Sequence, residues 1–260
     1  MDRTVCARLQ YDGTRFVGWQ VQPGGRTVQG EVEAVLGRLC GQPVRVHAAG
    51  RTDAGVHALG MAISATVPAR WTPAALHRAM NALLPQDCWV AEVREARSGF
   101  HARKSATGRS YLYRIGVDPA ARSPFRHPFE WALGQHPDAA VLATAARLLQ
   151  GRHDFRAFAV QTGDKENCWC TIRRVGWMER PGEQGWDLHI AADRFLHHMV
   201  RILAATMVDI ALGRRPLEDL TGLLLGGSAL RASPPAPPQG LFFVSAEYPD
   251  HWFHLGNDPA

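Results

Sequence analysis

A short glycine-flanked segment, residues 49–58, places an arginine close to an aspartate. It reads Ala-Gly-Arg-Thr-Asp-Ala-Gly-Val-His-Ala, so that Arg51 stands two residues before Asp53. Gly50 and Gly55 allow positive φ angles and the close approach of a substrate. A guanidinium so near can hold a carboxylate ionised and oriented. The pattern indicates a loop with a reactive carboxylate, although aspartates also close turns by bonding their own backbone.

Other segments hold residues that could contact an anionic group such as phosphate or pack in a core. Their members are His101 and Arg103 in FHAR, Arg109, Tyr111 and Tyr113 on a predicted strand, Arg201 in FLHHMVR, and Leu241 after Gly240. The two tyrosines share a strand face because side chains alternate with period two. Each residue taken singly also fits a structural role, as a core aromatic or a solvated charge. Arg201, on a largely apolar helix, needs an anionic partner, and Asp53 is one candidate.

The sequence predicts no metal site. His197 and His198 are adjacent, but neighbours on a helix point about 100° apart, and no acidic or cysteine partner follows at helical spacing. The cysteines are odd in number and widely spread, which argues against a disulfide framework. Cys168 and Cys170 have the wrong spacing for a zinc knuckle.

Composition favours a polyanionic partner. The net charge is +5, and 27 of the 29 basic residues are arginines (29 minus Lys104 and Lys165). Arginine binds phosphate in a bidentate fork, although a genome rich in G and C also replaces lysine with arginine. No apolar run approaches the length of about 20 residues that a membrane span needs, and no signal peptide is evident. We therefore expect a cytoplasmic protein without a membrane partner.

The hydrophobic pattern repeats one order of elements twice. The first series has strands at 5–11, 44–49, 61–67 and 90–97 with helices at 27–39 and 72–84; the second has strands at 110–116, 171–179, 186–191 and 241–248 with helices at 139–149, 195–212 and 216–225. Each series reads βαββαβ. The prediction is an α+β fold of two ferredoxin-like halves with mainly antiparallel sheets, pseudo-symmetric, with the active-site cleft between them. Residues 1–105 would carry the Asp53 loop, and residues 106–260 would complete the cleft.

Taken together, the motifs resemble the tRNA pseudouridine synthase A family over about residues 5–248. They follow in order as YDG-x-x-F-x-GWQ at 11–20, GRTDAGVHA at 50–58, an ALN-x-x-LP-like stretch at 80–85, FHAR to Y-x-Y at 100–113, HDF at 153–155, F-L-x-HMVR at 195–201, and GL at 240–241. The family's Gln-Val after the GRTDAGVHA loop is replaced by Met61-Ala62.

The resemblance implies an isomerase that converts uridine to pseudouridine in the anticodon stem-loop of tRNA, without a cofactor, a nucleotide or a metal. Asp53 would be the nucleophile, and Arg201 would pair with it. Tyr111 would stack on the flipped uracil, with Leu241 on the other side of the base. Arg51 would face the RNA, and His101, Arg103 and Arg109 would contact its backbone.

The resemblance also implies a homodimer that binds tRNA. Two alternatives come from other classes. A non-catalytic RNA-binding protein of paired ferredoxin-like domains would explain the fold and the charge, but it would not need Asp53. A glycosidase-like hydrolase would need a second carboxyl group as an acid, a role that Asp12 or Asp154 would have to fill.

Overall fold

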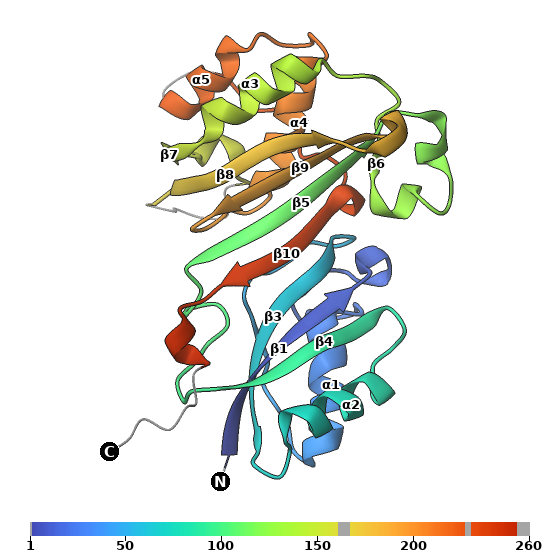
Figure 1. Cartoon of the computed structure of the whole chain (residues 1–260), viewed down its shortest axis with the longest axis vertical. Helices are drawn as coiled ribbons and strands as arrows, with labels where there is room; N and C mark the ends of the chain where they lie inside the picture. The colour runs from blue at the N-terminus through green and yellow to red at the C-terminus, as the bar shows by residue number, and fades with distance from the viewer. Residues whose placement is uncertain (1, 161–166, 227–229, 254–260) are drawn as a thin grey trace. The chain divides into compact units, whose positions relative to one another are not determined.

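The computed structural model describes residues 2–160, 167–226 and 230–253. It is a mixed α+β protein whose chain divides into two compact units, Met1–Thr107 with Phe243–Ala260, and Gly108–Phe242 (Figure 1). The helices among the described residues all lack the combination of length and apolar character that a bilayer span requires.

The first unit follows the predicted βαββαβ order. Its elements are β1 (Asp2–Tyr11), α1 (Val28–Cys40), β2 (His47–Ala48), β3 (His57–Pro68), α2 (Pro73–Leu83) and β4 (Cys88–Ala96). β1 pairs antiparallel with both β3 and β4, and the short β2 pairs with β3. Strand β2 covers only part of the predicted 44–49 strand. The mainly antiparallel pairing is confirmed.

Local signals place both helices of this unit. The side chains of Thr27 and Thr72 accept hydrogen bonds from the first turns of α1 and α2, and Pro73 occupies the first turn of α2. Gly41, with φ of 74°, ends α1. The buried stripe of α1 contains Val28, Val32, Val35 and Leu36, and α2 buries Leu76 and Met80. These side chains form the core with the buried alternate residues of β1.

The last strand, β10 (Leu241–Glu247), leads the chain back to the first unit. The Thr107 N–H donates to the Glu247 carbonyl (2.9 Å), and the Tyr248 hydroxyl donates to the Ala102 carbonyl (2.8 Å). The rings of Trp252 and Phe253 pack edge-on against Phe100. Residues 243–253 therefore lie with the first unit, whereas the predicted second subdomain, 106–260, includes them.

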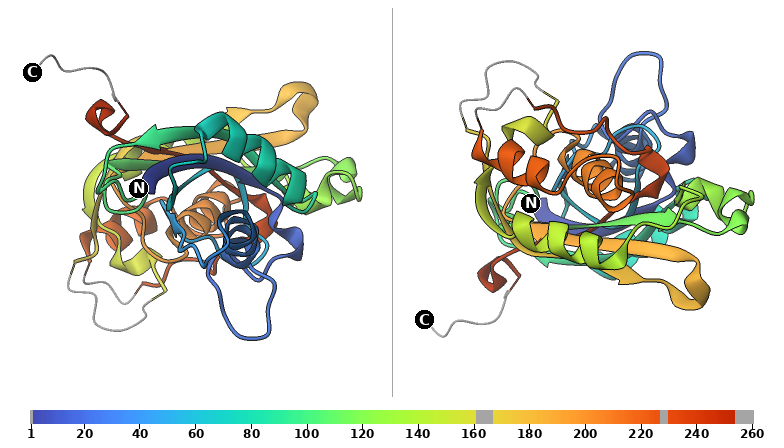
Figure 2. Two further views of the ribbon diagram at one scale, coloured as in Figure 1. Left: turned by 90° about the horizontal axis from the view of Figure 1, so that it is seen from below. Right: turned by 90° about the horizontal axis from the view of Figure 1, so that it is seen from above.

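The second unit contains β5 (Gly108–Gly116), β6 (Trp131–Ala132), α3 (Ala139–Leu149), β7 (Gly151–Asp154), β8 (Trp169–Glu179), β9 (Gly185–Ala192), α4 (Met199–Ala211) and α5 (Glu218–Leu225). The strand order is β5-β9-β8-β7, antiparallel throughout, with β6 added parallel to β5. Helices α3 (yellow-green), α4 and α5 (orange) pack together, as the view from above shows (Figure 2, right). Strands β6 and β7 are too short to give a periodic signal and were not predicted.

Helix α4 corrects one sequence-based boundary. The pattern predicted a helix from about residue 195, but α4 begins at Met199. His198 has φ of 61° and ψ of 2°, a left-handed conformation that no α-helix continues through. Phe195 and His197 therefore lie before the helix.

The mixed α+β class is thus confirmed, together with the series of predicted strands and helices. The pseudo-symmetric, ferredoxin-like relation of the two halves stays a prediction, as does the cleft between them.

Candidate active site

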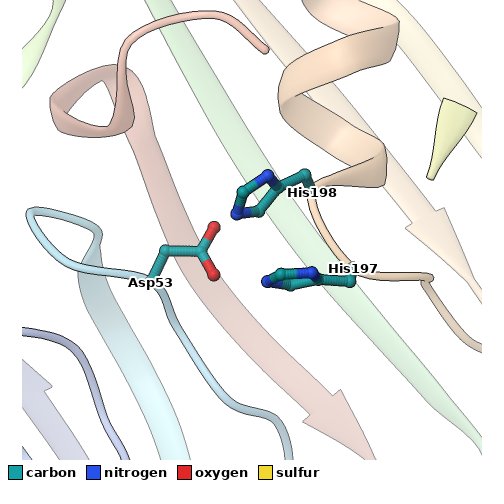
Figure 3. A group of neighbouring side chains, drawn as sticks. All are labelled: Asp53, His197 and His198. Atoms are coloured by element: carbon teal, nitrogen blue, oxygen red, sulfur yellow. The ribbon is translucent and has the colours of Figure 1, made fainter. Parts of the chain in front are cut away.

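Asp53 lies in the loop between β2 and β3 (Figure 3). Its neighbour Thr52 is buried, Asp53 itself is half-buried, and Arg51 is exposed. The Val56 N–H donates to the Asp53 carbonyl (3.2 Å), and Gly55 takes φ of 76° to close the turn. The backbone around the carboxylate is therefore fixed while the side chain keeps access to solvent.

The segment 11–20 supports this loop from the side. The hydroxyls of Tyr11 and Thr52 share a buried hydrogen bond of 2.8 Å. The Trp19 N–H donates to the Thr52 carbonyl (3.0 Å), and the Gly55 N–H donates to the Phe16 carbonyl (3.3 Å). These bonds lie on both sides of Asp53, so the YDG and GRTDAGVHA motifs form one local structure.

Two glycines permit this close approach of backbones. A Cβ on Gly13 would lie 2.0 Å from the Val56 carbonyl oxygen. Gly18 has φ of +103°, and a Cβ there would lie 2.8 Å from the Thr52 carbonyl oxygen. Any side chain at either position would push the Asp53 loop away.

His57 is a residue of this site that sequence reasoning left unassigned. Its side chain is buried, and its Nδ1 accepts a hydrogen bond from the Gly13 N–H (3.0 Å). The same nitrogen lies 3.2 Å from Oδ1 of Asp12. This carboxylate oxygen accepts a hydrogen bond from the Thr14 N–H (2.9 Å). The signal was present in the sequence, because His57 stands inside GRTDAGVHA.

Arg26 and Asp87 form an ion pair next to the segment 11–20, and sequence reasoning did not assign either residue to the site. The Arg26 guanidinium donates to both oxygens of Asp87 (2.6 and 2.9 Å) and lies 4.2 Å from the ring centroid of Phe16. Hydrogen bonds from Arg26 hold the pKa of the Asp87 carboxyl below its usual value. This ion pair joins residues 61 apart in sequence, so local patterns could not reveal it.

Tyr111 and Tyr113 have different surroundings on β5 of the second unit. Tyr111 is half-buried, and its ring meets Phe195 edge-on with centroids 5.0 Å apart. Tyr113 is fully buried, and its hydroxyl donates to the Pro237 carbonyl (2.8 Å). Burial raises the pKa of Tyr113 well above its usual value. Tyr113 is therefore a core residue, while Tyr111 keeps part of its ring accessible.

Arg201 stands in the first turn of α4. Its Nε donates to the Ala236 carbonyl (2.7 Å), and the Ala236 N–H donates to the Arg201 carbonyl (3.2 Å). These bonds tie α4 to the segment that leads into β10, where Leu241 is buried at the start of the strand. His197 and His198 precede α4 with ring centroids 4.0 Å apart (Figure 3). The absence of a metal site stays a prediction.

The predicted RNA-contacting residues differ in exposure. Arg103 is exposed. His101 stacks on His47 (centroids 4.3 Å apart), and its Nδ1 accepts from the backbone N–H of Arg103 (3.1 Å). Burial and the neighbouring His47 lower the pKa of His101, which favours the neutral ring. Arg109 is half-buried and donates to the Asp193 carbonyl (3.1 Å).

Three of the five cysteines are disfavoured as alternative nucleophiles. Cys6, Cys88 and Cys170 are buried, and burial raises the pKa of each thiol to about 12. Such thiols stay protonated near neutral pH and are poor nucleophiles.

The family model described as "tRNA pseudouridine synthase" matches residues 7–103 and 145–249. The chain belongs to this tRNA pseudouridine synthase family. A relative from Solidesulfovibrio magneticus named "tRNA pseudouridine synthase A" is 43% identical over 249 residues, which cover 92% of this chain and 89% of the relative. Relatives of the same name from Syntrophotalea carbinolica and Myxococcus xanthus are each 38% identical and cover 92% and 93% of this chain, and 94% and 91% of their own lengths.

The ranges matched by the tRNA pseudouridine synthase family model contain most of the predicted site. They include Arg51, Asp53, His101 and Arg103 in the first unit and Arg201 and Leu241 in the second, whereas Arg109 and Tyr111 lie between the two ranges. The predicted pairing of Arg201 with Asp53 joins residues of different units and stays a prediction.

Proposed function

We propose that this protein isomerises uridine to pseudouridine in the anticodon stem-loop of tRNA, with Asp53 as the nucleophile. The proposal rests on one observation above all. A chain of the tRNA pseudouridine synthase family holds a solvent-accessible carboxylate on a loop that is fixed on both sides by backbone hydrogen bonds. A carboxylate held in this way is suited to attack an electrophilic carbon.

The reaction exchanges one bond of the base for another. The bond between N1 of uracil and C1′ of ribose breaks, and a bond between C5 and C1′ forms. C5 loses its proton and N1 gains one, so the reaction involves no net oxidation or reduction. The Asp53 carboxylate acts by adding to C1′ or to C6, or by promoting a glycal, and it leaves again as a carboxylate.

The other predicted residues position the base. The target uridine has to leave its stack, and the accessible ring of Tyr111 would stack on the flipped uracil with Leu241 on the opposite side. Arg201 would pair with Asp53 and keep it ionised. Exposed Arg51 would hold RNA phosphates beside the flipped nucleotide. In this proposal the two units complete one site, and the protein acts as a homodimer in the cytoplasm without a cofactor.

Tritium release tests the proposal. tRNA carrying tritium at C5 of uridine is incubated with the wild type, with Asp53→Asn and with Asp2→Asn, in which an exposed aspartate at the start of β1 is changed in the same way. The wild type and Asp2→Asn are expected to release tritium without free uracil. Asp53→Asn is expected to release no tritium. Free uracil would instead indicate a hydrolase. Binding of tRNA without tritium release or free uracil would indicate a non-catalytic RNA-binding protein. Tritium release by Asp53→Asn equal to that of the wild type would exclude Asp53 as the nucleophile.

A further inference from the structure

The side chain of His57 joins the segment 11–20 to the Asp53 loop at a buried point. His57 begins β3, four residues after Asp53, and only 1% of its surface is exposed. Its Nδ1 accepts a hydrogen bond of 3.0 Å from the backbone N–H of Gly13, which is buried as well. A buried backbone N–H needs an acceptor, and here a side chain supplies it. The imidazole thus takes part in holding two backbone segments together.

The direction of this hydrogen bond determines where the imidazole carries its proton. Because Nδ1 accepts from Gly13, it offers a lone pair, and the proton of the neutral ring lies on Nε2. Oδ1 of Asp12, 3.2 Å from the same nitrogen, could instead accept a proton from Nδ1. That oxygen already accepts from the N–H (2.9 Å) and the hydroxyl (2.6 Å) of Thr14, whereas a protonated Nδ1 would deprive the buried Gly13 N–H of this acceptor. The contacts therefore favour the neutral ring with its proton on Nε2.

The contact of His57 with Gly13 has a counterpart on the other side of Asp53. Just before Asp53, the hydroxyls of Thr52 and Tyr11 share the buried hydrogen bond of 2.8 Å. Side chains therefore fasten the reactive loop to the segment 11–20 both before and after the carboxylate. The loop can shift if either bond is lost, and a displacement of about 1 Å at a reacting group can slow a reaction about a hundredfold.

We infer that His57 is a positioning residue for the isomerisation, which holds the Asp53 carboxylate in place by accepting the Gly13 N–H at Nδ1. With 1% of its surface exposed, His57 offers no surface for contact with RNA. It therefore affects the rate of the chemical step and leaves tRNA binding unchanged. The inference rests on the proposed function for the reaction that His57 serves.

Two replacements of His57, one with an acceptor and one without, test the inference. In His57→Asn the amide oxygen takes the place of Nδ1 and can accept from Gly13, whereas His57→Leu keeps bulk but has no acceptor. Single-turnover reactions with unmodified tRNA give the rate of pseudouridine formation, and equilibrium binding gives the affinity. His57→Leu is expected to lose about tenfold or more in rate and to bind tRNA within about twofold of the wild type. His57→Asn is expected to keep a rate within about threefold of the wild type, because it keeps the acceptor.

The matched control is His77→Leu, which removes a half-buried imidazole from α2 of the same unit. It is expected to keep the wild-type rate and affinity. Thermal unfolding of each variant shows that it is folded at the assay temperature. A wild-type rate in His57→Leu would overturn the inference, as would a loss of rate in His57→Asn equal to that in His57→Leu. A loss of tRNA affinity as large as the loss of rate would also overturn it.

The ¹⁵N NMR signals of the His57 ring test the inference without the reaction. They are assigned by their absence from the spectrum of His57→Asn. At neutral pH, Nδ1 is expected to give the shift of an unprotonated ring nitrogen and Nε2 that of a protonated one. A proton on Nδ1 would overturn the inference, even if His57→Leu failed to fold. A wild type that gives the expected spectrum but forms no pseudouridine would contradict the proposed function and leave the contact of His57 with Gly13 standing.

Discussion

Tyr111 and Tyr113 differ in burial, and this difference separates a candidate substrate contact from a core residue. Tyr113, two residues away on the same strand face, is buried and bonded to the Pro237 carbonyl, while Tyr111 remains half-buried against Phe195. Both residues follow the same alternation along the strand, so burial alone distinguishes them. A stacking role requires an accessible ring, and Tyr111 has one.

Substitutions of Tyr111 distinguish stacking of its ring on the base from proton transfer by its hydroxyl. Tyr111→Phe is expected to retain the edge-on contact with Phe195 and the stacking surface, and with them substantial activity. Tyr111→Ala is expected to lose most activity because the flipped base has no ring to pack on. The measurement is the rate of tritium release at saturating tRNA. Equal rates for the two variants would contradict a stacking role.

At the scale of elements, the Asp53 loop depends on a glycine in a different segment. Gly13→Ala is expected to destabilise the protein by more than about 1 kcal/mol and to slow catalysis, because its Cβ would lie 2.0 Å from the Val56 carbonyl oxygen. Gly37→Ala in α1 is the control, since its nearest neighbour lies 3.6 Å away and alanine favours helix by about 1 kcal/mol. Thermal unfolding and the activity of both variants are measured. If Gly13→Ala left both the stability and the activity unchanged, the segment 11–20 and the Asp53 loop would not be packed as described.

The ion pair of Arg26 with Asp87 predicts a pH dependence of stability. The folded-state pKa of Asp87 is lowered, so the pair stabilises the protein above the unfolded-state pKa, near 4, and this contribution disappears as the pH falls through the folded-state value. The difference in free energy of unfolding between the wild type and Asp87→Asn should therefore be large at pH 7 and shrink toward zero in acid. Denaturant titrations from pH 7 to pH 3 measure it. A constant difference would refute the role of the pair.

Sequence patterns predicted the presence of helices and strands better than the residues at which they begin and end. Caps and apolar stripes located α1, α2 and α3 closely, because those signals are local. The start of α4 was misplaced because apolar periodicity continues through Leu196, whereas the backbone turns left-handed at His198. Strand β7 was missed because four residues show no period, and its pairing with β8 comes from tertiary contacts.

At the scale of the whole molecule, the position of the Asp53 loop could be predicted from the sequence, but the contacts that support the loop could not. Asp53 and Arg51 stand in one motif, so residue types and spacing were enough to propose them as site residues. The contribution of His57 depends on its contact with Gly13, 44 residues away, and that of Arg26 on Asp87. The return of the chain to the first unit after Phe242 also depends on long-range hydrogen bonds, which periodicity does not encode.

In the proposed reaction the Asp53 carboxylate is needed to form pseudouridine, while binding of the tRNA depends on other residues. The most direct test is a single-turnover reaction with enzyme in excess over unmodified tRNA, followed by nuclease digestion and quantification of pseudouridine. The wild type is expected to convert the tRNA, whereas Asp53→Asn is expected to bind it with similar affinity and to form no pseudouridine. Pseudouridine formed by Asp53→Asn at the wild-type rate would rule out Asp53 as the nucleophile.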